Sequence, residues 1–492
     1  MKIYLDHEYK YDLEQIILAL FPNELPEFSN LPYDFAQIDE NSDKKFIISN
    51  LTISQKKVTV NTRISLDGET GTKTCVGALP DPKILPDPTR IIKHTIKRSV
   101  YLAAKPLLSA PLPWGALTGI RPSKVASMAL DWSNGNPVLA KNILKNSYYV
   151  SEKRAGLALQ TAFAAKAIAA QLPVDRAALY VSIPFCPGRC NYCSFVSHSI
   201  ENAKDLITPY LDALCAELEH TGKILHAKGR RLNSIYIGGG TPTVLTADQL
   251  AALMQVIGQS FDIADLEYTV EAGRADTITL EKLEVLANAG VNRISVNPQS
   301  LDPSVLKSAG RNTTPEQIIK ALELALSYPQ FAVNADLIAG LQDDTPESFE
   351  RSLARVIALK PHNITVHSLA YKKAAAIYKD KDTTGGCIEK MLNIAGRLLA
   401  KAEYAPYYLY KQKYTPGGFE NVGYALNGKV CRYNVYMMEE LCTVIGAGAG
   451  AVTKIVAPGK IERIFNYKYP YEYINNADKT QKGKEQLAER WF

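Results

Sequence analysis

Strand-like and helix-like segments alternate regularly over residues 177–370, and this pattern limits the possible folds. Six short apolar runs, each followed by a segment of helical or turn character, predict strands near 178–183, 234–237, 267–271, 293–297, 331–338 and 363–368. Successive β/α units favour a parallel sheet with right-handed crossovers. The expected fold class is therefore α/β, with an incomplete (β/α)6 barrel at its centre.

Helix-start signals support this division. Thr246 is followed three residues later by Gln249, the spacing of a capping box, and Thr345 is followed directly by Pro346. By the same reasoning, Thr208 and Pro209 predict the start of the first barrel helix.

Three of the eight cysteines, Cys186, Cys190 and Cys193, lie together just after the first predicted strand. Prolines and glycines in this stretch place them on a loop. Grouped thiolates favour zinc or an iron-sulfur cluster. A structural zinc site needs a fourth ligand, for which His198 is the nearby candidate. A cubane cluster with three cysteines would leave one iron open to a substrate or cofactor, and unligated buried cysteines are a third interpretation.

Polar or glycine-rich signals also follow the other predicted strands. They are the Gly-Gly-Gly-Thr-Pro-Thr sequence at 238–243, then Glu271, Gln299 and Asp336. Each has a structural alternative, because a triple glycine can simply form a tight turn and a strand-end acid can cap a helix. The carboxyl ends of parallel barrel strands meet on one face, however, so the convergence predicts a shared cofactor site beside the cysteine loop.

The Cys-x3-Cys-x2-Cys motif after a strand resembles the radical S-adenosylmethionine (SAM) superfamily. With the 238–243 loop, Gln299 and the Gly-Ala-Gly-Ala-Gly run at 446–450, it is similar to the oxygen-independent coproporphyrinogen III oxidase/dehydrogenase-like family over about residues 177–455. The similarity is nearest to the HemZ branch, whose members carry an N-terminal extension.

The resemblance implies two cofactors, a [4Fe-4S] cluster and SAM. It implies that the cluster is bound by Cys186, Cys190 and Cys193. Positions that would contact SAM are Tyr180, Tyr192, Gly239, Gly240, Thr241 and Glu271. Positions that would bind a nucleoside moiety, where the family can hold a second SAM, are Gln299, Arg311 and Asp336.

The family's activity is the oxidative decarboxylation of propionates to vinyl groups in porphyrin and haem biosynthesis. The implied partners are a tetrapyrrole substrate, either coproporphyrinogen III or haem-like, and an electron donor such as flavodoxin or ferredoxin. The carboxylates of such a substrate call for cationic side chains. The candidates are Arg121, Arg311 and Arg432.

Two positions depart from the family oxidases. Ser182 stands where they have a histidine, and Phe195 stands where they have a fourth cysteine, an ending shared with the haem-chaperone branch. Three alternatives to the oxidase activity therefore stay open. They are a haem-binding chaperone, another tetrapyrrole-modifying radical SAM enzyme that transfers methyl groups or opens the ring, and a tRNA-modifying radical SAM enzyme.

The 492 residues suit several domains. The pattern predicts a small α/β module at 1–85, a helical region at 86–173, the barrel at 174–372 and a C-terminal α+β segment covering the site at 373–492. The net charge of +6 is too small to argue for nucleic acid. Polar residues directly after Met1 argue against a signal peptide, and no apolar stretch is long enough to span a membrane. A cytoplasmic protein with reduced cysteines is expected.

Overall fold

The computed structural model describes the whole chain except residues 23, 31–43, 80–86, 174, 196–197, 372–374, 376–385, 414, 458 and 491–492. The chain divides into two compact units. The first comprises Met1–Gln160, Lys381–Glu389 and Tyr410–Glu420, and the second comprises Thr161–Asp380, Lys390–Leu409 and Asn421–Phe492. The predicted boundaries at 85/86 and 372/373 lie outside the described residues, so the four-part division stays a prediction.

The first unit contains a five-stranded sheet in the order β2-β1-β3-β4-β5. Its elements are β1 (Lys2–Leu5), α1 (Lys10–Leu20), β2 (Glu27–Asn30), β3 (Lys45–Ile53), β4 (Lys57–Leu66) and β5 (Glu69–Ala78). The outer strands β2 and β5 were not predicted, because β2 has only four residues and β5 is largely polar and exposed. Neither strand therefore shows the apolar alternation that marks β4.

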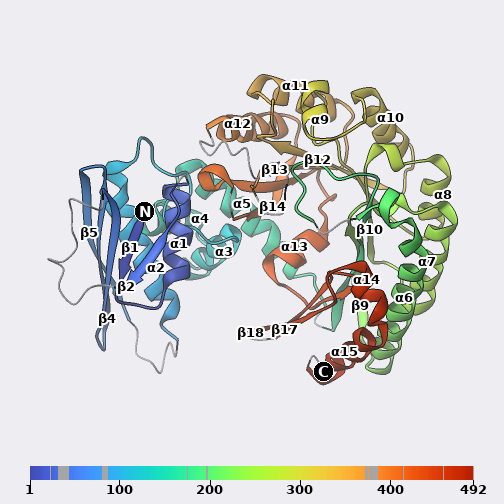
Figure 1. Cartoon of the computed structure of the whole chain (residues 1–492), viewed down its shortest axis with the longest axis horizontal. Helices are drawn as coiled ribbons and strands as arrows, with labels where there is room; N and C mark the ends of the chain where they lie inside the picture. The colour runs from blue at the N-terminus through green and yellow to red at the C-terminus, as the bar shows by residue number, and fades with distance from the viewer. Residues whose placement is uncertain are drawn as a thin grey trace. The chain divides into compact units, whose positions relative to one another are not determined.

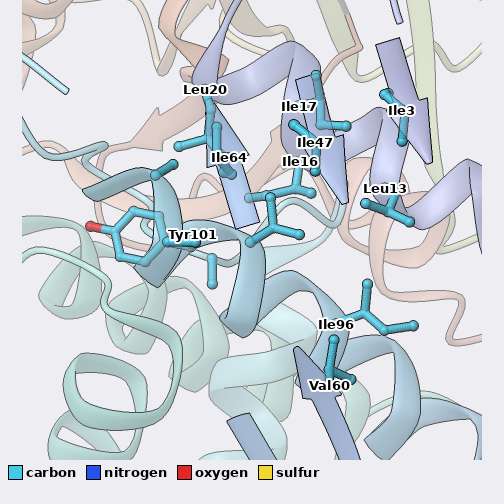
Figure 2. Close-up of a cluster of buried hydrophobic side chains, with 14 of the residues drawn as sticks. Ile3, Leu13, Ile16, Ile17, Leu20, Ile47, Val60, Ile64, Ile96 and Tyr101 are labelled. Carbon is cyan, nitrogen blue, oxygen red and sulfur yellow. The ribbon is translucent and has the colours of Figure 1, made fainter. Parts of the chain in front are cut away.

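The core of this unit forms between the sheet, α1 and α2 (Thr89–Ala104). Ile3 of β1, Leu13 and Ile17 of α1, and Ile96 of α2 are fully buried in it (Figure 2). Burying each such side chain contributes about 1.5–3 kcal/mol, which stabilises the sheet against the two helices. The helices that follow are α3 (Pro122–Trp132), α4 (Pro137–Tyr148) and α5 (Glu152–Ala169).

Charged side chains are buried where residues 410–420 join this unit. Glu420 accepts a hydrogen bond from Trp114 Nε1 at 2.7 Å and pairs with Arg154 Nε at 2.8 Å. Lys411 Nζ donates to the Leu117 carbonyl at 3.1 Å. Burial lowers the pKa of Lys411 to about 8. These contacts tie the 410–420 segment to the loop that precedes α3.

The second unit is built on an eleven-stranded sheet in the order β14-β15-β13-β12-β11-β10-β9-β6-β16-β17-β18. Six of these strands are the predicted ones and run parallel to one another. They are β6 (Arg176–Ile183), β9 (Arg231–Gly239), β10 (Glu267–Gly273), β11 (Arg293–Val296), β12 (Ala332–Ala339) and β13 (Asn363–Ser368). The sheet ends at β14 and β18 without closing, so the predicted partial barrel is confirmed.

Helices that follow the barrel strands cover the outer face of the curved sheet (Figure 1). They are α6 (Ile200–Ala227), α7 (Ala247–Ser260), α8 (Leu280–Asn288), α9 (Pro303–Ser308), α10 (Pro315–Leu326) and α11 (Pro346–Ala358). Thr246 and Gln249 form the predicted capping box of α7, and Thr345 caps α11. No helix in the described residues is both long and apolar enough to cross a membrane.

The predicted start of the first barrel helix was wrong. Pro209 lies inside α6, which already begins at Ile200 and is kinked at Ala203. The buried face of this helix starts before the proline, with Ala203 and Ile207. Tertiary packing of these side chains therefore outweighs the local Thr-Pro signal.

The C-terminal part extends the sheet at both ends. At one end β15 (Glu420–Ala425) pairs antiparallel with β13, and β14 (Ala405–Lys411) lies beyond it. At the other end β16 (Val444–Ala447) adds a seventh parallel strand beside β6. The remaining elements are β7 (Phe185–Cys186), β8 (His198–Ser199), α12 (Gly386–Lys401), α13 (Arg432–Glu439), β17 (Val452–Ala457), β18 (Lys460–Phe465), α14 (Pro470–Asn475) and α15 (Ala477–Arg490).

Helix α13 lies on the concave side of the curved sheet (Figure 1). Glu267, the first residue of β10, accepts hydrogen bonds from the backbone N–H groups of Arg432 and Tyr433 at 2.9 and 2.8 Å. The ring of Tyr433 stacks on that of Tyr236 in β9, with 4.4 Å between centroids. The helix is thus capped by a carboxylate from the barrel and presents an aromatic side chain to its interior.

Candidate active site at the carboxyl ends of the barrel strands

The cysteine loop begins where β6 ends. Cys186 is the last residue of β7, and Cys193 N–H donates to the Cys190 carbonyl at 3.1 Å, which makes a tight turn. Cys190 is buried, whereas Cys186 and Cys193 are half-buried. Burial raises the pKa of the Cys193 thiol, and the neighbouring Cys190 and Cys186 raise it further. Cys186 and Cys190 are therefore close enough to Cys193 to influence the ionisation of its thiol.

The glycine loop after β9 is hydrogen-bonded to the start of the cysteine loop. Gly240 N–H donates to the Ile183 carbonyl at 2.8 Å, and Thr241 N–H donates to the Phe185 carbonyl at 2.7 Å. A Cβ atom on Gly240 would lie 2.4 Å from the Phe185 oxygen, so only glycine permits this approach. The Thr241 hydroxyl also lies 3.5 Å from Cys186 Sγ.

Glu271 lies on β10 next to this glycine loop. The hydroxyl of Tyr236 donates to Glu271 Oε1, and a Cβ on Gly238 would lie 2.8 Å from Glu271 Oε2. Burial raises the pKa of Glu271 to about 7, although the bond from Tyr236 opposes that shift. The ring of Tyr180 lies 6.3 Å from that of Tyr236, so Tyr180 belongs to the same group.

Gln299 and Asp336 are joined through their backbones. Gln299 has a left-handed φ of 66°, and its N–H donates to the Asp336 carbonyl at 2.8 Å. Gln299 Oε1 is buried and has no hydrogen-bond partner among the described residues. Burial would raise the pKa of Asp336, but His367 and Asn334 outweigh it, and the pKa is lowered. Asn334 Nδ2 donates to Asp336 Oδ1 at 2.8 Å.

Arg311 and Tyr192 lie beside Cys190. Arg311 is buried and donates to the Asn297 carbonyl at 2.7 Å, while its Nε atom has no partner among the described residues. Burial raises the pKa of Tyr192, which the charge of Arg311 opposes. These contacts join the cysteine loop to the glycine loop, and they place Glu271 beside the glycine loop, Gln299 beside Asp336, and Arg311 beside Tyr192 and Cys190.

The donors in this group fit the two expected cofactors. Among the described residues, no group of three or more His, Cys, Asp or Glu side chains is arranged so that it could hold a metal ion. The three neighbouring thiols on one loop nevertheless supply the soft ligands of an iron-sulfur cluster. The partnerless buried atoms of Gln299 and Arg311 are available to a polar ligand. His198, the alternative zinc ligand, lies opposite Phe185 in the β7–β8 pair.

Some neighbours of the site were missed or misjudged from the sequence. Arg274 Nη1 lies 3.6 Å from Cys190 Sγ and its guanidinium pairs with Asp276 at 2.7 Å. It directly follows Gly273 at the end of β10, so the strand-end rule could have found it. Of the three arginines considered for substrate carboxylates, Arg311 belongs to this group. Arg432 lies beside Glu267 at the opposite end of β10, and Arg121 belongs to the first unit.

Residues 180–356 match the model of the radical SAM superfamily. The oxygen-independent coproporphyrinogen-III oxidase-like protein HemZ of Bacillus subtilis is 36% identical over 393 residues, covering 77% of this chain and 78% of that protein. The chain belongs to this family of radical SAM proteins. Superfamily members use a [4Fe-4S] cluster and SAM, so these are the cofactors of this family member.

Other relatives in the family differ in the functions that their names state. The heme chaperone HemW of Escherichia coli is 29% identical, covering 60% of this chain and 75% of that protein. The structure of coproporphyrinogen III oxidase (HemN) from Escherichia coli superposes with a TM-score of 0.52 and 26% identity, covering 65% of this chain and 73% of that chain. The radical SAM fold is thereby shown, and the relatives include both an oxidase and a chaperone.

Proposed function

We propose that this chain is an oxygen-independent coproporphyrinogen III dehydrogenase-like enzyme. It would convert propionate side chains of the porphyrinogen into vinyl groups, and each conversion would release CO2, transfer one hydrogen atom to the SAM-derived group and pass one electron to an external acceptor. One observation carries the proposal: the cysteine and glycine loops are hydrogen-bonded to each other at the ends of β6 and β9. It is supported by 36% identity to a coproporphyrinogen oxidase-like relative over 77% of the chain.

In this proposal the cysteine loop holds the cluster through Cys186, Cys190 and Cys193. Residues that hold SAM are Tyr180, Tyr192, Gly239, Gly240, Thr241 and Glu271. Residues that would hold a nucleoside moiety, where the family can hold a second SAM, are Gln299, Arg311 and Asp336. When bound, the cluster and SAM would supply one-electron radical chemistry for removing a hydrogen atom from the substrate.

The protein's own contribution is orientation and exclusion of water. Gly240 lets the glycine loop approach the cysteine loop, because no side chain intervenes. Because the pKa of Glu271 is about 7, its carboxyl group is partly ionised and partly protonated near neutral pH. Arg311 is a buried cation that suits a carboxylate group. Tyr433 of helix α13 stacks on the ring of Tyr236 in β9, which helps to exclude water from that face of the ring.

A haem-binding chaperone is the second candidate function. Phe195, at the position where the family oxidases have a fourth cysteine, has an exposed fraction of 63%. The 29% identity to heme chaperone HemW also favours this alternative. In a chaperone, the cluster and SAM sites would be retained without turnover of a porphyrinogen.

Anaerobic turnover distinguishes the two functions. Reconstituted protein is incubated with a low-potential reductant such as reduced flavodoxin, SAM and coproporphyrinogen III, and vinyl products and CO2 are quantified. The oxidase proposal predicts vinyl products in proportion to SAM consumed. Stoichiometric haem binding with no CO2 release would instead establish the chaperone, and salt-sensitive binding to tRNA would favour an RNA-modifying enzyme.

A further inference from the structure

We infer that the C-terminal helix α15 positions the cysteine loop through a buried ion pair between Lys484 and Glu217. The pair would hold the backbone after β16 against the end of β6, from which the cysteine loop starts. This inference rests on the proposed role of that loop in binding the cluster. Neither Lys484 nor Glu217 belongs to the cysteine motif.

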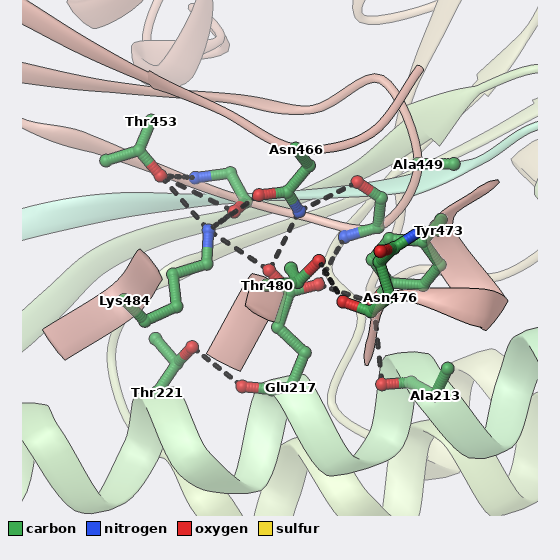
Figure 3. Close-up of polar contacts among 12 residues, drawn as sticks. Ala213, Glu217, Thr221, Ala449, Thr453, Asn466, Tyr473, Asn476, Thr480 and Lys484 are labelled. Carbon is green, nitrogen blue, oxygen red and sulfur yellow. Dashed lines mark hydrogen bonds and ion pairs between the residues drawn. The ribbon is translucent and has the colours of Figure 1, made fainter. Parts of the chain in front are cut away.

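The ion pair is completely enclosed in the second unit. Lys484 has an exposed fraction of 0% and Glu217, on α6, one of 1%. Lys484 Nζ lies 3.1 Å from Glu217 Oε1 (Figure 3). Lys484 Nζ also donates to the Gly446 carbonyl and, at 3.2 Å, to the Thr453 hydroxyl. A single side chain of α15 therefore binds both α6 and the strands β16 and β17.

Glu217 uses its remaining acceptor capacity on the same region. Its Oε2 atom accepts from Gly448 N–H at 2.8 Å and from the Tyr473 hydroxyl at 2.5 Å, and its Oε1 atom accepts from Asn466 Nδ2 at 2.8 Å (Figure 3). Apolar side chains often stabilise a core as well as a buried ion pair does. What the pair adds is a fixed geometry for the groups that it binds, including the backbone at Gly446 and Gly448.

The backbone held by this pair touches the end of β6 directly. A Cβ on Gly448 would lie 2.6 Å from the Ser182 carbonyl oxygen, so the two segments are in close contact. Tyr210 bridges them as well, because its hydroxyl accepts from Ala449 N–H at 3.0 Å and donates to the Ser182 carbonyl at 2.6 Å. Displacing the 446–449 segment would therefore displace the end of β6, which leads directly into the cysteine loop.

Tyr210 extends the connection to the cysteine loop itself. Its ring meets Phe185 edge-on, with 5.2 Å between centroids and an interplanar angle of 90°. It also contacts Tyr473 of α14 at 5.3 Å. Phe185 directly precedes Cys186, and its carbonyl accepts the hydrogen bond from Thr241 of the glycine loop. Lys484 and Glu217 are thus positioning residues for both loops.

The experiment compares Lys484→Met with wild type after anaerobic reconstitution. Iron content, the cluster's reduction potential, the EPR spectrum with and without SAM, and Tm are measured. We expect iron to be retained, the potential and the SAM-induced EPR change to be altered, and Tm to fall. Lys482→Met is the matched control, because Lys482 is exposed on the same helix, and it should match wild type in all four measurements.

The double variant Lys484→Met/Glu217→Gln separates positioning from stability. It removes both charges, so Tm should recover towards wild type, while the shifted potential and EPR response should persist. If the double variant restores these signals together with Tm, or if Lys484→Met leaves them unchanged, the inference is overturned. If wild type itself binds no cluster, the proposed function fails instead, so the two failures are distinguishable.

Discussion

The Tyr236 hydroxyl donates a hydrogen bond to Glu271 Oε1 across the neighbouring strands β9 and β10. The face of the same tyrosine ring stacks on Tyr433 of α13. One side chain from the C-terminal segment thereby fixes the orientation of a tyrosine that in turn binds a carboxylate of the candidate SAM site. Helix α13 can therefore influence the hydrogen bonding of Glu271 indirectly, through Tyr236.

Replacing Tyr236 with phenylalanine should weaken SAM binding near neutral pH. The Tyr236 hydrogen bond lowers the pKa of Glu271, so its removal should raise that pKa and leave less ionised carboxylate. Because a hydrogen bond to a charged group is worth this much free energy, its loss should increase the Kd for SAM roughly threefold to tenfold. The SAM-induced change in the EPR spectrum of the reduced cluster, titrated at several pH values, measures the Kd and its pH midpoint.

Tyr268→Phe is the matched control for this substitution. Tyr268 is a buried tyrosine of β10 whose hydroxyl contacts Met254 Sδ at 2.9 Å, away from the candidate site. The Tyr268→Phe substitution should leave the pH midpoint for SAM binding unchanged. Equal midpoints in Tyr236→Phe and Tyr268→Phe would show that the Tyr236 hydrogen bond does not control the ionisation of Glu271.

Glu271 should also make the stability of the cofactor-free protein depend on pH. Burial raises its pKa from the ordinary 4.5 to about 7 in the folded state. A raised folded pKa contributes stability that is fully present below about pH 4.5 and is lost as the pH rises through about 7, by up to about 3 kcal/mol. Glu271→Gln cannot ionise, so its free energy of unfolding in urea should change less over this interval. Parallel pH curves for the two proteins would contradict this.

The barrel and the location of its site were predictable because they depend on local signals and one general rule. Apolar runs and helix caps such as Thr246 mark the β/α units, and the carboxyl ends of parallel strands always meet on one face. Cys186, Gly240, Glu271 and Asp336 could therefore be grouped from their positions in the sequence alone. Their roles in binding follow from the family resemblance and stay predictions.

The rest depends on contacts between residues far apart in the chain. Strand β16 is a short Gly- and Ala-containing segment whose pairing with β6 has no local signal. Helix α13 is located by Glu267, and the C-terminal helix by the pair of Lys484 with Glu217. The apolar pattern of a segment shows that it has a buried face but does not identify the element that covers it.

Removing the buried carboxylate of Glu420 should destabilise the first unit. Arg154 and Glu420 have side-chain exposures of only 4% and 1%, and Trp114 Nε1 shares the same carboxylate. Glu420→Ala would leave Arg154 charged and buried without this partner, which costs about 3–5 kcal/mol. Urea unfolding followed by tryptophan fluorescence measures the change.

The control for Glu420→Ala is an exposed ion pair. Glu350 pairs with Arg397 at 2.6 Å, but their side chains are 41% and 60% exposed. Glu350→Ala should therefore cost at most about 1 kcal/mol. If both variants lose the same small amount of stability, the Glu420 carboxylate does not hold the 410–420 segment in the way its contacts indicate.

The junction between the glycine and cysteine loops gives the sharpest test of the candidate site. In Gly240→Ala the new Cβ would lie 2.4 Å from the Phe185 oxygen and 2.9 Å from the Ile183 oxygen. Both are backbone atoms, so the two loops must separate and the hydrogen bonds from Gly240 and Thr241 must lengthen. We expect SAM binding to fall at least tenfold, about 1.4 kcal/mol, in the reconstituted protein. Gly188→Ala, within the cysteine loop but with no atom within 4 Å of its Cβ position, should bind SAM as wild type does. Equal SAM affinity in the two variants would mean that contact between these loops does not form the SAM site.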